Sequence, residues 1–195
     1  MIALVALLLS APLRPAEAGS VPTLEDATSG LGAGTLMATV ETSSGSFSIR
    51  LYKKKAPELV ANFVALARGK QAFQDPKDRT RWVKRPFYDG LFVFGRKPDF
   101  VVQFGCPRGD GRGEPGYTLT RPEASAPHDA AGTVSMVGFD DRLSGSQLFI
   151  ALKPQPHLDA QHRVFGRVTR GLEVVFQLAE AIGTPTIKSV RIHRQ

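Results

Sequence analysis

Apolar and polar residues alternate over short runs along most of this chain, which is the period of half-buried β-strands. In Phe47–Tyr52 every second residue, counted from the first, is apolar, so one face of a strand there would be buried. Another short apolar run, Leu36–Val40, lies upstream, and turn-forming residues at Ser43–Gly45 separate the two. The pattern predicts a β-hairpin.

Two later segments change to a helical period. Pro57 suits a first helical turn, apolar residues then recur at helical spacing, and Gly69 stands where a helix would end. Leu172–Leu178 predicts a second short helix, and Ile187–Ile192 predicts a closing strand. Many short strands with two helices fit an antiparallel barrel, although periodicity does not distinguish a barrel from a sandwich.

The N-terminal segment differs from the rest. Ile2–Leu9 is an apolar run too short to span a membrane, and Ala16–Ala18 has the small-x-small pattern of a secretory cleavage site. We therefore predict a signal peptide over residues 1–18, a flexible leader over 19–35, and one domain over 36–195. Export to the periplasm or the cell exterior follows, and the alternative is a disordered tail on a cytoplasmic protein, since no basic residue precedes the apolar run.

Lys70–Arg85 is charged and has no apolar period. We expect this segment to be an exposed loop, with Trp82 as its only anchor.

Composition adds limits on function. The 195 residues carry a net charge of +7, but the basic residues are scattered, so we expect no nucleic-acid partner; we also expect no membrane span and a monomer. The four histidines lack metal-ligand spacing, and the single cysteine, Cys106, matches no nucleophile motif. Gly109–Gly116 lacks the lysine that ends a phosphate-binding loop, so we interpret it as a turn.

Two motifs are specific. FYDGLFVFGRKPDFVVQFGCP at Phe87–Pro107 and GSQLFIALKPQPHLDAQHRVFG at Gly145–Gly166, preceded by ANFVALARG, resemble the signature of the cyclophilin-type peptidyl-prolyl cis-trans isomerases. The resemblance implies a mainly β fold, a closed eight-stranded antiparallel barrel capped by two α-helices. It also implies isomerisation of X-Pro bonds in proline-containing peptides or unfolded proteins, which assists protein folding, and it implies no cofactor.

The resemblance also assigns site residues. Those that match the family's proline pocket and the polar positions around it are Phe100, Val101, Gln103, Val137, Gly138, Gln147, Phe149, Leu158 and His162. His157 stands where eukaryotic members often carry tryptophan, which implies weak binding of cyclosporin-type peptides.

Gly95 departs from the family pattern, because the family has there an arginine that stabilises the twisted amide. Phe94 likewise replaces the preceding histidine. Strand alternation predicts that Arg96 points to the opposite face and that Lys97 shares the face of Gly95. A bulge at the glycine would turn Arg96 into the site, which makes Arg96, Gln103 and His162 the catalytic candidates. Two hypotheses remain: an isomerase with reduced activity, and a proline-peptide-binding module or chaperone on the same fold.

Overall fold

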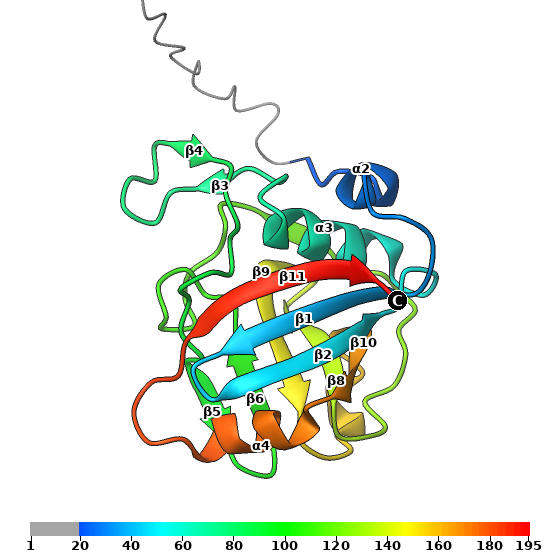
Figure 1. Cartoon of the computed structure of the whole chain (residues 1–195), viewed down its shortest axis with the longest axis vertical. Coiled ribbons are helices and arrows are strands. Elements are labelled where there is room, and N and C mark those ends of the chain that lie inside the picture. The colour runs from blue at the N-terminus through cyan, green and yellow to red at the C-terminus, as the bar shows by residue number, and fades with distance from the viewer. Residues whose placement is uncertain (1–19) are drawn as a thin grey trace, which may run out of the picture.

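The computed structural model describes residues 20–195, so the predicted signal peptide lies outside the described residues. This part of the chain is mainly β, with a curled antiparallel sheet and three α-helices (Figure 1). Eight strands follow one another across the sheet in the order β11 (Ile187–Arg194), β1 (Leu36–Thr42), β2 (Gly45–Leu51), β10 (Arg163–Arg170), β8 (Thr133–Phe139), β9 (Arg142–Ala151), β6 (Val101–Phe104) and β5 (Gly95–Lys97). A further short strand, β7 (Thr118–Thr120), pairs with β9. The predicted hairpin and closing strand are confirmed.

The expected closed barrel is not what the structure shows. No strand ladder joins β5 to β11 within the described residues; the contact there is a single bridge between Phe92 and Thr186. Backbone hydrogen bonds from Gly90 N–H and Val93 N–H to the carbonyls of Ile187 and Pro185 supplement it. The sheet is therefore a half-barrel, open at this edge because β5 is only three residues long.

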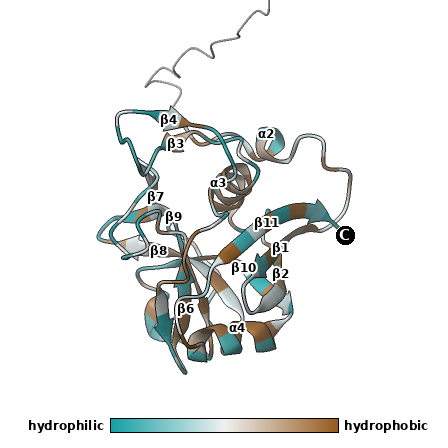
Figure 2. Ribbon diagram, turned by 60° about the vertical axis from the view of Figure 1, so that its left-hand side comes forward, coloured by the Kyte–Doolittle hydropathy of each residue, from teal (hydrophilic) through white to brown (hydrophobic). Residues whose placement is uncertain are grey.

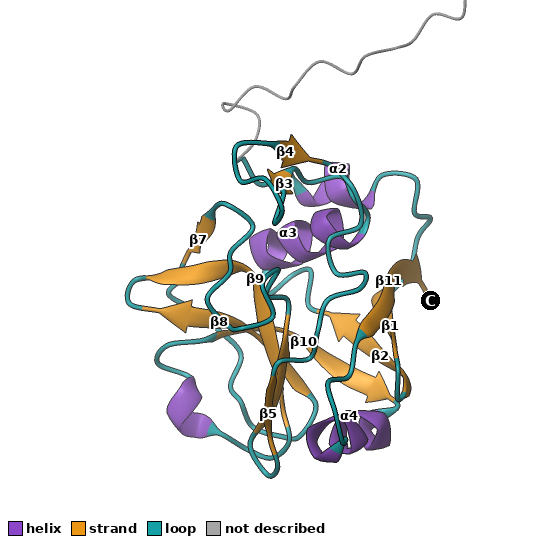
Figure 3. Cartoon of the chain, turned by 90° about the vertical axis from the view of Figure 1, so that its left-hand side faces the viewer, coloured by secondary structure: helices purple, strands orange, loops and turns teal. Residues whose placement is uncertain are grey.

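Helices cover both ends of the curled sheet (Figure 3). Helix α3 (Pro57–Ala67) begins at the predicted proline and is followed by Gly69, whose φ of 68° suits a glycine after a helix. Every residue of α3 from Leu59 to Ala67 is buried, so it is a core helix and not an amphipathic one. Helix α4 (Leu172–Glu180) matches its prediction and carries hydrophilic and hydrophobic residues in alternation (Figure 2).

The predicted flexible leader contains a helix, α2 (Leu24–Thr28), that packs on α3. Thr23 caps it by accepting a hydrogen bond from Asp26 N–H. Arg68 donates to the carbonyls of Ala27 and Ser29, and the Ala27 side chain is fully buried. The prediction was wrong for these residues, because their contacts cover the outer side of α3.

The Lys70–Arg85 segment is likewise not simply a loop. It contains a two-stranded hairpin, β3 (Phe73–Gln74) and β4 (Trp82–Val83). Phe73 is buried and packs edge-on against Phe87, with ring centroids 4.8 Å apart. Trp82 is half-buried, so Phe73 is the main anchor, and the hydrophilic turn between the two strands is the exposed part (Figure 2).

Within residues 20–195, no helix has both the length and the apolar character needed to cross a bilayer.

Candidate functional site

The outer face of strands β6 and β9 carries Val101, Gln103, Gln147 and Phe149. Cross-strand partners point to the same side of a sheet, and one row of partners runs from Gly95 to Gln103, Phe149 and Ser135. A second row contains Lys97, Val101 and Ala151. Residues from separate motifs therefore meet on one face.

Phe149 lies between two histidine rings. Its ring stacks on His128, with centroids 5.6 Å apart and planes 12° apart, and meets His162 edge-on at 5.0 Å. His128 is fully buried, and its Nδ1 lies 2.5 Å from Asp159 Oδ1, which also accepts the His128 backbone N–H. Burial acts to raise the pKa of Asp159, but the hydrogen bonds from His128 outweigh it and lower that pKa. This pair fixes the ring behind Phe149.

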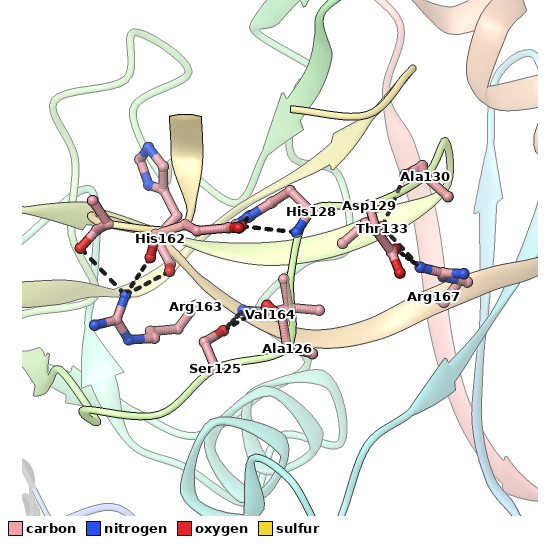
Figure 4. A network of polar contacts seen from close by, with 12 residues as sticks. Ser125, Ala126, His128, Asp129, Ala130, Thr133, His162, Arg163, Val164 and Arg167 are labelled. Atoms are coloured by element: carbon pink, nitrogen blue, oxygen red, sulfur yellow. Dashed lines mark hydrogen bonds and ion pairs between the residues drawn. The ribbon is translucent and has the colours of Figure 1, made fainter. Parts of the chain in front are cut away.

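The loop that carries Leu158 and His162 is held to β10 by one arginine. It opens with a 3-10 helix, Pro156–Leu158. The Arg163 guanidinium donates to the carbonyls of Asp159 and His162 at 3.0 and 2.8 Å, and Figure 4 shows these bonds beside the His128 contact. Leu158 and His162 therefore have defined positions.

Phe100 packs against the 3-10 helix that precedes Leu158. Its ring is parallel to that of His157, with centroids 6.0 Å apart, and the Lys97 ammonium lies 5.3 Å from the Phe100 centroid. The residues Phe100, Val101, Phe149, Leu158 and His162 are called the apolar wall below.

His162 is held neutral. Its Nδ1 accepts the Gly138 N–H at 2.8 Å, and burial lowers the pKa of His162 to about 4. Val137 lies at an irregularity in the β8–β9 pairing, and a Cβ at Gly138 would overlap the Gln161 carbonyl. The main-chain N–H of Gly138, one of the positions matched to the family's site, is therefore bound to His162.

The polar side of the groove consists of Gly95, Gln103 and Gln147, called the amide row below. Gln103 Nε2 lies 3.3 Å from Gln147 Oε1. A Cβ built on Gly95 would lie 2.7 Å from Gln103 Cβ and 3.1 Å from its Oε1. The Gln103 side chain therefore fills the space that a larger residue 95 would need.

Comparison with known proteins decides the family. The profile of the cyclophilin type peptidyl-prolyl cis-trans isomerase/CLD family matches residues 37–195. The chain belongs to this family. Peptidyl-prolyl cis-trans isomerisation is accordingly the function of this cyclophilin.

Curated relatives agree. Peptidyl-prolyl cis-trans isomerase B of Bacillus subtilis is 40% identical over 143 residues, covering 73% of this chain and 87% of the relative. A peptidyl-prolyl cis-trans isomerase of Synechococcus elongatus is 37% identical over 155 residues, covering 78% of this chain and 95% of the relative. A Cryptosporidium parvum cyclophilin crystal structure, 22% identical, covers 83% of this chain and 99% of its own, with a TM-score of 0.68, and shows the same fold.

This cyclophilin does not bring Arg96 to the groove. Arg96 pairs with Val102, a core residue, on the face opposite Gln103. Its guanidinium donates to the Ala181 carbonyl, just past α4, at 2.5 Å. The expected bulge at Gly95 is absent, since β5 pairs with β6 in register, and strand alternation therefore directs Arg96 away.

Sequence reasoning missed four residues that support the site of this cyclophilin: Glu114, His128, Asp159 and Arg163. The partners of Glu114 and His128 lie some 30 residues away in sequence. One signal was available, because Glu114 is a charged residue inside a glycine-rich turn. Among residues 20–195, no cluster of three potential metal ligands occurs.

Proposed function

We propose that this cyclophilin isomerises X-Pro bonds of folding proteins through its apolar wall and one side-chain amide, without an arginine, and therefore slowly. Rotation about the X-Pro bond is opposed by about 18–20 kcal/mol of lost amide resonance. No covalent step is needed. A catalyst has only to hold the proline and favour the twisted amide over the planar one.

The observation that carries the proposal is the apolar wall. Phe149, with His128 behind it and His162 beside it, provides a rigid surface for the proline ring. The planar amide is the more charge-separated form, so removal from water destabilises it more than the twisted form. His162 remains neutral and keeps this surface free of charge at neutral pH.

What the site lacks is a donor aimed at the amide nitrogen. Loss of one such group commonly costs about 100- to 1,000-fold in rate. Lys97 is the cation nearest the wall on the Gly95 face, but its ammonium lies over Phe100. We therefore expect substrate affinity to be preserved better than turnover.

A second candidate follows from the position of Arg96. With that guanidinium bound to Ala181, the groove is suited to a proline-peptide-binding module or chaperone. A structural neighbour solved in the presence of the dipeptide Ala-Pro, 23% identical with a TM-score of 0.66, supports a test with short proline peptides.

We further propose that the protein is exported, on the basis of Ile2–Leu9 and Ala16–Ala18. Its clients would then be proline-containing segments of proteins that fold outside the cytoplasm. N-terminal sequencing of protein recovered from the culture medium or periplasm tests this; an intact Met1 in the cytoplasm would contradict it.

NMR exchange spectroscopy on an X-Pro peptide tests the main proposal. We expect exchange above the uncatalysed rate, with about 100-fold lower efficiency than a cyclophilin that retains the arginine. If the protein binds the peptide but does not accelerate exchange, the second candidate, a proline-peptide-binding module, replaces the isomerase proposal.

A further inference from the structure

Glu114 is a charged residue whose carboxylate lies among hydrogen-bond donors. It accepts from Ser144 Oγ at 2.7 and 2.8 Å, from Gly145 N–H at 2.9 Å, and from Gln147 Nε2 at 3.0 Å. Burial raises the pKa of Glu114, while these hydrogen bonds act against that rise. A buried carboxylate is costly unless it is hydrogen-bonded, and bonds to a charged acceptor are strong. The carboxylate of Glu114 therefore holds these donors in place.

The Gln147 amide can take only one orientation beside this carboxylate. Its Nε2 also lies 3.1 Å from the Gly111 carbonyl and 2.9 Å from the Gly113 carbonyl. All three neighbours are acceptors, so only the NH₂ group satisfies them. Gln147 Oε1 must therefore face the opposite way.

The orientation of the Gln147 amide determines that of Gln103, the next amide in the row. Gln147 Oε1 lies 3.3 Å from the Gln103 side chain, so Gln103 directs its Nε2 there. Its own Oε1 is left on the Gly95 side, 3.1 Å from where a Cβ of residue 95 would lie.

We propose that Glu114 is a positioning residue that sets, through Gln147, the amide orientation of Gln103, so that Gln103 offers the peptide a hydrogen-bond acceptor beside Gly95. The inference rests on the proposed function and deepens it. Where other family members present a donor, this site selects a peptide with a free backbone N–H next to the proline.

The surroundings of Glu114 define its pH dependence. Tyr88 and Tyr117 are near it, and burial raises the pKa of both, so they stay neutral. Asp75, Arg79 and Arg108 line the hollow that Glu114 borders. Protonation of Glu114 replaces one of the three acceptors around the Gln147 NH₂ group with a donor, while the Gly111 and Gly113 carbonyls remain. The hold on the Gln147 amide should therefore weaken as pH falls.

The test compares Glu114→Gln with Glu114→Asp and with the exposed control Glu123→Gln. The probes are an X-Pro peptide and versions N-methylated at each backbone N–H that flanks the proline. In the wild type, one N-methylation should weaken binding about tenfold, the value of a lost hydrogen bond to a fixed acceptor. Glu114→Gln should reduce that penalty and shift the side-chain amide NMR signals of Gln103 and Gln147, while Glu114→Asp and Glu123→Gln should keep both.

Unchanged amide signals together with an unchanged N-methyl penalty in Glu114→Gln would overturn the proposal. If that variant does not fold, the same amide signals can be followed in the wild type as pH falls. Gln147→Leu, which removes the amide between Glu114 and Gln103, gives a second test of the proposal. None of these readouts requires turnover. A wild type that binds but does not isomerise would therefore remove the proposed function and leave this inference to be judged by binding.

Discussion

The apolar wall and the amide row lie next to each other and share strands β6 and β9, but they differ in chemistry. The wall is built of aromatic and aliphatic side chains and is supported by the His128–Asp159 pair. The row carries two side-chain amides and has Gln103 beside Gly95. Because neighbouring positions on the same strands differ in this way, substitutions can test proline binding and stabilisation of the twisted bond one at a time.

Removal of the wall should have the largest effect. Phe149→Ala deletes the ring between His128 and His162, and we expect peptide affinity to fall about 30-fold or more, since central aromatic contacts dominate binding. Stability should fall by about 3 kcal/mol as well. Isothermal titration and thermal unfolding measure both, with the exposed Phe176→Ala as the control. Affinity within threefold of the wild type would show that the wall is not the binding surface.

Removal of the Gln103 amide should show whether the amide row and the apolar wall contribute separately. Gln103→Ala should reduce kcat/KM about tenfold by deleting the acceptor, while the dissociation constant of an X-Pro peptide already N-methylated at the bonded N–H changes little. Exchange spectroscopy and titration give the two numbers, with the exposed Gln177→Ala as the control. Equal losses in rate and affinity would mean that the amide row also holds the proline.

Restoring the family residue should cost stability. In Gly95→Arg, the new Cβ collides with Gln103, so we expect a loss of about 1–3 kcal/mol and little gain in rate. Adding Gln103→Gly, which also removes the Cβ that lies nearest, should relieve the strain, and a double-mutant cycle of unfolding measures this. A stable single variant with restored turnover would show that Gln103 moves aside freely.

Acid should weaken the wall through His162. Its folded pKa of about 4 lies below the ordinary 6.5, so the unfolded chain binds the proton more readily. Stability is therefore complete above pH 6.5 and decreases as pH falls toward 4, by about 1–2 kcal/mol after allowance for solvent screening. His162→Phe should flatten that window in denaturant titrations, and an unaltered slope would assign it to another group. His193→Phe, on a different face, is the control.

The smallest effect should come from Arg96. Arg96→Ala removes a hydrogen bond to Ala181 and should cost about 1 kcal/mol of stability with turnover unchanged. A drop in turnover beyond threefold would reinstate Arg96 as the replacement cation. The exposed Lys188→Ala controls for the lost charge.

The sequence was sufficient for local elements. Alternation and helix punctuation predicted the β1–β2 hairpin, α3 and α4, because those signals lie within a few residues. The sequence was insufficient where contacts between residues far apart in the chain determine the structure. Arg96 finds its partner 85 residues away, and α2 is stable only against α3. The Thr23–Asp26 cap was a local sign of that helix that we did not use.

The contact between Gly95 and Gln103 also limits what can be built at this position. A side chain placed at position 95 would meet an occupied space, so any such variant begins with a less stable protein. Because the nearest atom is Gln103 Cβ, a change of rotamer at Gln103 does not make room. Positions 95 and 103 therefore form one design unit, and a larger residue at the first requires a smaller one at the second.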